Sequence, residues 1–138
     1  DWDQRQEFRG IVCLYRDLIR LRRNVEGVTA GLCGQFTQVF HLNGERRVLG
    51  FHRWNRGGAG DDVVVIANFS HQPLDDCRVG LPAAGTWTLR FNSDWHGYSD
   101  SFAGHPSGDV EAVPGDWDGL PFHAVCSIGP YSALIYSQ

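Results

Sequence analysis

Two strand-length stretches decide the fold of this sequence: VLGFHRW at residues 48–54 and VVVIANF at residues 63–69. Both are rich in the β-branched and aromatic residues that suit a pleated surface. The second is apolar from Val63 to Ala67, which predicts a central strand that is covered on both faces. The segment between them, NRGGAGDD, contains three glycines and is typical of a hairpin loop. We therefore expect the two strands to pair antiparallel at the centre of a sheet.

Apolar and polar residues alternate with a period of two along the rest of the chain, in short runs separated by turns. In the run GTWTLRFNS, Trp87, Leu89 and Phe91 alternate with polar residues, so we expect them to share one face. The last two runs are expected to close the chain as a hairpin across Gly129 and Pro130. Short strands at this spacing predict an all-β antiparallel sandwich or barrel. The expected strands are residues 36–42, 48–54, 63–69, 77–81, 85–93, 109–113, 122–128 and 131–137.

One helix precedes these strands, over residues 5–23. Its apolar residues repeat at the spacing of a single helical stripe, and Leu14 and Leu21 widen that stripe. The stripe itself consists of Phe8, Ile11, Val12, Tyr15, Leu18 and Ile19. Such a broad apolar arc predicts that one side of the helix packs on the sheet while the other side contacts something else.

The length and composition bound the class of protein. A chain of 138 residues, 42% hydrophobic and 20% charged, is typical of one globular domain with its own core. The net charge of −4 provides no basic field for nucleic acid or for anionic lipid, so neither is an expected partner. No run reaches membrane-spanning length and no signal peptide is recognisable, which favours a cytoplasmic protein. The chain has no methionine and begins DWDQRQEF, so we expect a piece of a longer or processed protein.

The cysteines and histidines show no metal or redox motif. The four cysteines stand at 13, 33, 77 and 126, without zinc-ligand or dithiol spacing, and we expect free thiols in a reducing compartment. The six histidines stand at 41, 52, 71, 96, 105 and 123, and we interpret them as scattered surface or edge residues. We expect no metal and no cofactor.

The sequence also lacks an evident catalytic constellation. A glycosidase needs two carboxylates held across its substrate, but the acids of residues 94–118 mostly adjoin Gly, Ser or Pro, where Asp is favoured for turn formation. No serine lies in a nucleophile elbow and no glycine-rich run has the form of a phosphate loop. The aromatic residues of this polar region allow two interpretations, sugar stacking or a small core beneath a long loop. They are Trp95, Tyr98, Phe102 and Trp117.

The order of these features resembles the end of an α-amylase-superfamily protein, nearest the 1,4-α-glucan branching enzymes. YRDLIRLRR is similar to the last helix of that family's catalytic (β/α) barrel, and VLGFHRW followed by VVVIANFS is similar to the start of its C-terminal all-β domain. GTWTLRFNSD and IGPYSALIYS are similar to later strands of that domain. The resemblance implies an antiparallel Greek-key β-sandwich and a parent that acts on α-1,4-glucans such as glycogen or starch. It also implies that the catalytic acids belong to the barrel, so no catalytic residue is expected here.

From the resemblance we divide the chain into residues 1–34, the helix and connector at the end of a missing barrel, and residues 35–138, the β-sandwich domain. The expected function is that of a non-catalytic domain that stabilises the barrel and contacts α-glucan polymer. The alternatives are a free-standing carbohydrate-binding module and a structural interaction domain without a ligand. We also expect self-association through the helix. The residues nominated for glucan contact are Asn92, Asp94, Trp95, His96 and Tyr98.

Overall fold

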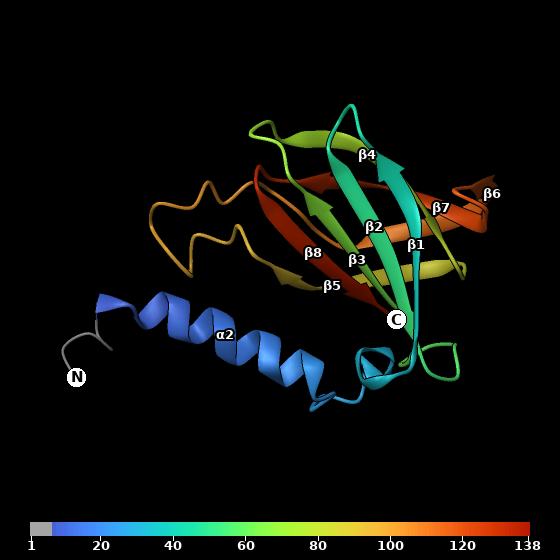
Figure 1. Ribbon diagram of the computed structural model, residues 1–138, viewed down its shortest axis with the longest axis horizontal. Coiled ribbons are helices and arrows are strands. Elements are labelled where there is room, and N and C mark those ends of the chain that lie inside the picture. Colours follow the sequence, from blue (N-terminus) through green and yellow to red (C-terminus); the bar gives the residue numbers. More distant parts are fainter. Residues whose placement is uncertain (1–6) are drawn as a thin grey trace.

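Two packed β-layers form the body of the molecule, and one long helix lies along the outside of the larger layer (Figure 1). The computed structural model describes residues 7–138. The helix, α2, runs from Arg9 to Arg22, and a short 3-10 helix, η1, covers Ala30–Cys33. The strands are β1 (Phe36–Asn43), β2 (Val48–Trp54), β3 (Val63–Asn68), β4 (Leu74–Leu81), β5 (Gly85–Asn92), β6 (Val110–Trp117), β7 (Leu120–Ile128) and β8 (Ser132–Ser137).

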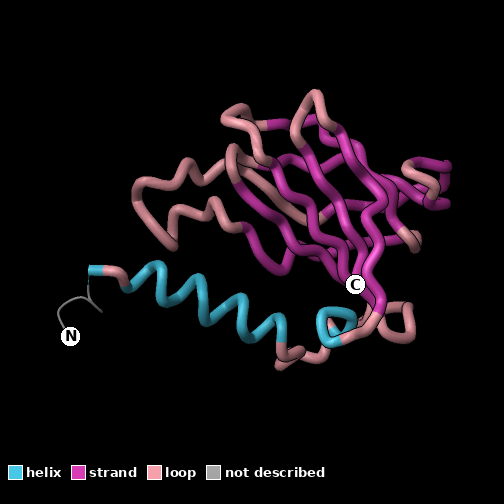
Figure 2. Tube along the Cα trace, in the orientation of Figure 1, coloured by secondary structure: helices cyan, strands magenta, loops and turns pink. Residues whose placement is uncertain are grey.

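The strands pair antiparallel in the order β1-β2-β3-β8-β5-β6-β7-β4. Strands β5, β6 and β7 follow one another as neighbours, and β8 returns to lie beside β5, which is a Greek-key arrangement. The predicted antiparallel all-β class is therefore confirmed. Figure 2 shows the strands as a continuous magenta body whose loops gather at its ends, with the helix outside it.

The two stretches that decide the fold pair as predicted. β2 and β3 are antiparallel neighbours, with Phe51 opposite Val65, and β8 lies on the other side of β3. Val64 and Ile66 point into the core between the layers, whereas Val63 and Val65 pack toward α2. Of the five residues from Val63 to Ala67 that were expected to be covered, four are buried and Ala67 is half-buried, so the prediction of a strand with two covered faces is confirmed.

The main core lies between the layers and is built around Trp87. This indole is fully buried, and its N–H donates a 3.0 Å hydrogen bond to the carbonyl of Ala83. A buried indole of this size contributes a large apolar area and requires such a partner for its single donor. Other residues of this core are Val48, Ile66, Leu81, Ile128, Leu134 and Tyr136.

The prediction that the last two strands form a hairpin is wrong. β7 pairs with β4 and β6, whereas β8 pairs with β3 and β5, so the chain passes from one layer to the other at Gly129 and Pro130. The crossing is held by hydrogen bonds to the Gly129 carbonyl from the Asn68 amide, at 3.0 Å, and from the Ser132 hydroxyl, at 2.7 Å. Two apolar strands with a short connection do not reveal whether they share a layer, because both arrangements bury them.

The expectation that Trp87, Leu89 and Phe91 share one face is also wrong. Trp87 and Leu89 belong to the core between the layers, but Phe91 packs toward α2. The register between β5 and β8 shifts between Leu89 and Phe91. An extra residue in one strand turns the following side chains to the opposite face. The extra residue, Arg90, donates a 2.9 Å hydrogen bond from Nε to the Ser137 hydroxyl.

The structure places the four cysteines as free thiols, with Cys77 and Cys126 directly opposite each other on β4 and β7. The expectation that the histidines are surface or edge residues is wrong for His52, which is buried and lies 2.8 Å from the Asp62 carboxylate. A neighbouring carboxylate, Asp61, organises the β2–β3 loop by accepting backbone N–H groups. Within residues 7–138, no helix is both long enough and apolar enough to cross a membrane.

Candidate functional site

The outer side of α2 carries a row of exposed apolar side chains. The row is a consequence of the wide apolar arc, because only one side of that arc is covered by the sheet. Cys13, Leu14, Leu18 and Leu21 face the sheet. The exposed members, here called the helix stripe, are Phe8, Ile11, Val12, Tyr15 and Ile19, each between 36% and 63% exposed. The prediction that one side of the helix packs and the other stays bare is confirmed.

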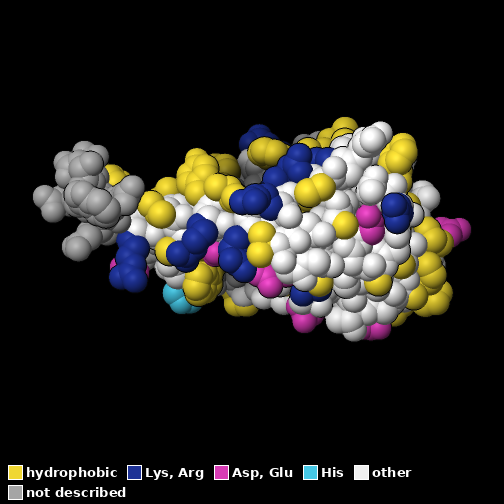
Figure 3. Space-filling model, turned by 90° about the horizontal axis from the view of Figure 1, so that it is seen from below, with side chains coloured by type: hydrophobic (Ala, Val, Ile, Leu, Met, Phe, Trp, Pro, Cys, Tyr) yellow, Lys and Arg dark blue, Asp and Glu magenta, His cyan; other side chains and the backbone are white. Residues whose placement is uncertain are grey.

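Arginines flank the helix stripe. A shallow surface depression of about 610 Å³ is lined by Ile11, Val12, Tyr15 and Ile19 together with arginines. Figure 3, which views the molecule from the side on which α2 lies, shows yellow hydrophobic groups and dark blue basic groups side by side. Arg20 is already paired with Glu26, which leaves Arg16 and Arg23 as the basic groups nearest the stripe. An apolar strip with a charged border is typical of a surface that another protein covers.

The helix is seated on the sheet incompletely. An apolar cavity of about 440 Å³, open to solvent, remains between α2 and the larger layer, lined in part by Leu14, Leu18, Phe51 and Ile135. The apolar atoms that line it lose the packing contacts that a closely seated helix would provide. The position of α2 therefore depends on more than its contacts with the sheet.

One polar contact compensates for this loose seating. The Tyr98 hydroxyl donates a 2.7 Å hydrogen bond to the Asp17 carboxylate of α2. Burial of the ring and this contact with a carboxylate raise the pKa of Tyr98 well above its usual range. Tyr98 is thus a neutral donor that ties the β5–β6 segment to the helix. The backbone of Tyr98 also passes so close to Gly10 that any side chain at position 10 would collide with it.

Of the five residues nominated for glucan contact, three hold the β5–β6 segment together. Asp94 is buried, and its carboxylate accepts N–H groups from Ala103 at 3.1 Å and from His105 at 3.0 Å. The Asn92 side chain accepts the N–H of Asp94 at 3.0 Å. Tyr98 is 7% exposed beneath α2. The interpretation of these aromatic residues as a small core under a long loop is therefore confirmed for Tyr98.

The other two nominated residues, Trp95 and His96, remain on the surface. Trp95 is 50% exposed and meets the ring of Tyr98 edge to face, with their centroids 5.0 Å apart. The edge-to-face contact holds the indole in place while part of its surface stays open. Glucan contact at this loop stays a prediction, and in this geometry it rests on Trp95 and His96.

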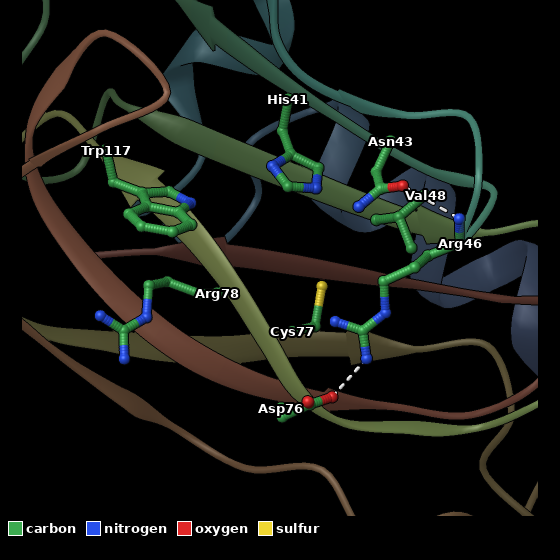
Figure 4. Close-up of a pocket in the computed structure, with 8 residues that line it drawn as sticks. All are labelled: His41, Asn43, Arg46, Val48, Asp76, Cys77, Arg78 and Trp117. Carbon is green, nitrogen blue, oxygen red and sulfur yellow. Dashed lines mark hydrogen bonds and ion pairs between the residues drawn. The ribbon is translucent and has the colours of Figure 1, made fainter.

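A second site lies on the far side of the sandwich from α2, where the first and last strands of the sheet order, β1 and β4, approach each other. A pocket of about 280 Å³ opens between these two edge strands (Figure 4). It is here called the seam pocket. Its side chains come from β1, the β1–β2 turn, β2, β4 and β6: His41, Asn43, Arg46, Val48, Asp76, Cys77, Arg78 and Trp117. Of these eight residues, only Trp117 belongs to the aromatic set for which the sequence allows sugar stacking.

One ion pair and one cation–π contact shape the seam pocket. Arg46 and Asp76 form an ion pair across it, and the Arg78 guanidinium lies over the Trp117 ring, 5.3 Å from the centroid. The pKa of Asp76 is lowered by its hydrogen bond to Arg46 and by the charge of that arginine. The pocket therefore offers an aromatic ring beside several charged hydrogen-bonding groups.

The same region contains no arrangement suited to metal binding. Among residues 7–138, no cluster of three or more His, Cys, Asp and Glu side chains is placed to hold an ion. The His41 ring lies 2.9 Å from Asp118, and the His105 ring lies 2.8 Å from Asp75. The first pair joins β1 to the β6–β7 turn, and the second joins the β5–β6 segment to β4.

The comparisons with known proteins place this fold in one class, the all-β domains that accompany α-amylase-type catalytic domains. Residues 40–138 match the family described as alpha amylase, C-terminal all-beta domain, and the chain belongs to that family. A 1,4-alpha-glucan branching enzyme GlgB of Nocardia farcinica is 33% identical over 97% of this chain, and one of Dechloromonas aromatica is 34% identical over 88%.

Another 1,4-alpha-glucan branching enzyme GlgB, from Leifsonia xyli, is 41% identical over 63% of this chain. These matches span only 12% to 18% of the length of the relatives. Among solved structures, the crystal structure of alpha-amylase from H. orenii aligns with 90% of this chain and 19% of its own, with 25% identity and a TM-score of 0.47.

Proposed function

We propose that this chain is the non-catalytic C-terminal domain of a glucan-active enzyme of the branching-enzyme type, and that α2 joins it to the catalytic part. Membership of the C-terminal all-β domain family supports the first half of the proposal. The relatives named 1,4-alpha-glucan branching enzyme GlgB support the choice of parent. In this proposal residues 1–34 form the junction with the catalytic barrel and residues 35–138 form the β-sandwich domain.

The observation that carries the proposal is that α2 has two apolar faces and the sheet covers only one. The occupant proposed for the helix stripe is the remainder of the parent enzyme, because the matched segment is 18% of the Nocardia relative and the larger part lies outside it. A partner fitting this surface presents apolar side chains to Val12, Tyr15 and Ile19 and acidic groups to Arg16 and Arg23. Burial of the stripe also presses α2 onto the sheet and stabilises its incomplete seating.

The proposed lack of catalytic activity is supported by how the buried carboxylates of this domain are used. Glycoside chemistry needs one carboxyl group as acid and another as nucleophile or base, both free to face a sugar. Here Asp61 and Asp94 accept backbone N–H groups, and Asp62 binds His52 and the N–H of Gly58. These carboxylates hold loops, and none is free to face a sugar ring in a pocket.

The test of docking adds this chain in trans to the Nocardia farcinica branching enzyme from which the matching segment has been deleted. We expect the two proteins to co-elute in gel filtration and to melt at a higher temperature together than apart. The double variant Tyr15→Ser/Ile19→Ser should lose co-elution while its own β-sandwich still folds. Leu42→Ser is the matched control, because Leu42 is 78% exposed on β1, away from the helix. Equal co-elution of both variants, or none with the unchanged chain, contradicts the proposal.

The test of the non-catalytic assignment incubates the purified chain alone with amylose. We expect neither new reducing ends nor a change in the iodine absorption spectrum that accompanies branching. Cleavage or branching by the isolated chain overturns the assignment. Restored activity upon addition to the deleted enzyme would support both halves of the proposal.

A further inference from the structure

We propose that the seam pocket between β1 and β4 binds a short segment of α-glucan, with the Trp117 indole as the surface on which a sugar ring stacks. The ligand class rests on the proposed function, since it is the substrate class of the proposed parent. The location rests on the geometry of the pocket alone. This site is separate from the helix stripe and from the loop that carries Trp95.

The sheet topology creates the pocket. The order of strands begins with β1 and ends with β4, and these two edges come together without pairing as neighbours. β4 contains a register shift between Leu74 and Cys77, and bulges of this kind redirect side chains at the edge of a sheet. Asp76 lies within this shift and reaches across the seam to Arg46. The gap between the edges is therefore bridged by side chains and leaves room for a ligand.

The turn that follows Trp117 fixes the backbone of this residue at the side of the pocket, and the Arg78 guanidinium lies over its ring. Trp117 pairs with Leu120, and the two residues between them, Asp118 and Gly119, both have positive φ, as a tight hairpin turn requires. The Asp118 carboxylate accepts the N–H of Gly80 at 2.8 Å and contacts the His41 ring at 2.9 Å. One carboxylate thus ties the turn to both edge strands.

Gly80 completes this support. A side chain at position 80 would collide with the carbonyl of Trp117, so only glycine lets the β6–β7 turn approach β4 this closely. A binding surface is effective when its aromatic ring is held before the ligand arrives, because less ordering is lost on binding. Trp117 is held in this way and yet remains 43% exposed.

The groups around Trp117 suit a neutral polyhydroxyl ligand. Arg46 and Asp76 neutralise each other through their ion pair, and the Arg78 charge lies over the indole ring. The Asn43 side-chain oxygen accepts the N–H of Arg46 at 2.9 Å, which directs the amide nitrogen away from that contact. Figure 4 shows Asn43, Arg46 and His41 on one side of the pocket and Trp117 with Arg78 on the other. Hydroxyl groups of a sugar can both donate to Asp76 and accept from Asn43, Arg46 and Arg78.

Protection of the edges explains some of these charges but not the indole. Charged residues on edge strands prevent pairing with another chain, and Asp76 and Arg78 on β4 have this effect. The exposed Trp117 ring, which lies on β6 beside the seam, has the opposite tendency because it adds an apolar surface there.

The experiment titrates maltoheptaose into the 138-residue chain and follows the indole N–H signals by two-dimensional NMR. The Trp117 signal is assigned from the spectrum of Trp117→Ala. We expect saturable movement of this signal with a dissociation constant on the order of millimolar, as for an open site that orders its ligand. Trp117→Ala should weaken the affinity by at least about tenfold, as the loss of a central aromatic anchor does, and the backbone N–H signals of Asn43 and Arg78 measure this loss. Circular dichroism checks that the variant is folded.

Tyr131→Ala is the control, because the Tyr131 ring is 72% exposed and lies outside the seam pocket. It should leave the maltoheptaose titration unchanged. Trp95→Ala separates the seam pocket from the β5–β6 loop, where Trp95 is exposed to a similar extent as Trp117. Loss of binding in Trp95→Ala but not in Trp117→Ala overturns the inference and moves the site to the loop. Absence of any indole shift up to saturating maltoheptaose overturns it as well. So does movement of the Trp117 signal by inorganic phosphate alone, which would identify an anion site.

These outcomes are independent of the test of the proposed function. The helix stripe and the seam pocket lie on different elements, so Trp117→Ala should retain co-elution with the deleted branching enzyme. Loss of docking with intact maltoheptaose binding contradicts the proposed contact with the parent enzyme but agrees with the proposed glucan site in the seam pocket. Intact docking without maltoheptaose binding contradicts the proposed glucan site but agrees with the proposed contact with the parent enzyme.

Discussion

The hydroxyl of Tyr98 and the carboxylate of Asp17 are joined by a 2.7 Å hydrogen bond between segments 81 residues apart in the chain. This bond connects α2 to the segment between β5 and β6, which lies beside the start of the helix in Figure 1. Because an apolar cavity remains under the helix, this bond and the nearby apolar contacts determine how firmly α2 is held.

Tyr98→Phe removes the hydroxyl and leaves the ring. We expect a loss of about 1.5–3 kcal/mol in the free energy of unfolding, the range for a hydrogen bond to a charged partner. Urea unfolding measures the loss, and amide hydrogen exchange should quicken in α2 more than in β3. Tyr131→Phe is the control, because the Tyr131 ring is 72% exposed and the change should have little effect. Equal stability of both variants would show that the bond does not hold the helix.

The two faces of β3 should respond differently to a buried charge. Val64 is fully buried between the layers, whereas Val65 is 9% exposed and borders the cavity under α2. Val64→Asp should cost more than about 3 kcal/mol, because the carboxylate has neither water nor a partner there. Val65→Asp should also destabilise the fold, but less than Val64→Asp does, because the cavity gives the carboxylate some access to water. Thermal melting compares the stabilities of the two variants, with Val125→Asp as the control at an exposed position. If Val65→Asp melts at the same temperature as the unchanged chain, the assignment of β3 as a central strand is wrong.

Asp61 should make the molecule sensitive to acid. Burial raises the pKa of its carboxyl, but hydrogen bonds from the N–H groups of Asn55, Gly57 and Arg56 outweigh this, and the pKa is lowered. A group with a lowered folded-state pKa stabilises the protein above its unfolded pKa, and that stability is lost as the pH falls through the folded value. The melting temperature should therefore fall between about pH 5 and pH 2 partly through Asp61.

Asp61→Asn tests this origin of the acid sensitivity. The amide oxygen still accepts N–H groups, but it does not titrate, so the variant should be less stable at neutral pH and less dependent on pH in the acid range. We expect a loss of about 0.5–2 kcal/mol at neutral pH, comparable to the loss of a capping side chain. If the melting temperature falls with decreasing pH in the same way in both proteins, other carboxylates cause the acid sensitivity.

Local patterns predicted the strands well because side-chain alternation and turn residues are properties of neighbouring positions. They failed at Phe91 because one extra residue in β5 reverses every face that follows. They failed at the β7–β8 connection because the choice of layer depends on contacts with β3 and β4, which are distant in sequence. Long-range pairing is therefore the part that the alternation pattern does not contain.

The candidate sites show the same division. The helix stripe was predictable, because the width of an apolar arc is visible in a single helical period. The seam pocket was not, because His41, Asp76 and Trp117 meet only after the strand order returns β4 to β1. Loop residues Asp94 and Tyr98 were nominated as ligand contacts from their types alone, whereas their hydrogen bonds are made within the protein.

The helix stripe should make the isolated chain self-associate. Its five large apolar side chains form a continuous exposed strip, and such strips tend to find partners when their own is absent. Two copies that face each other through α2 would bury the same residues on both, as a two-fold interface does. We expect sedimentation velocity to show a concentration-dependent shift from monomer to dimer. Val12→Ser/Ile19→Ser should abolish the shift, whereas Val39→Ser, with Val39 54% exposed on β1, should retain it. A chain that stays monomeric at high concentration would show that the stripe alone is too small to drive association, and a dimer that survives the double variant would place the interface on another surface.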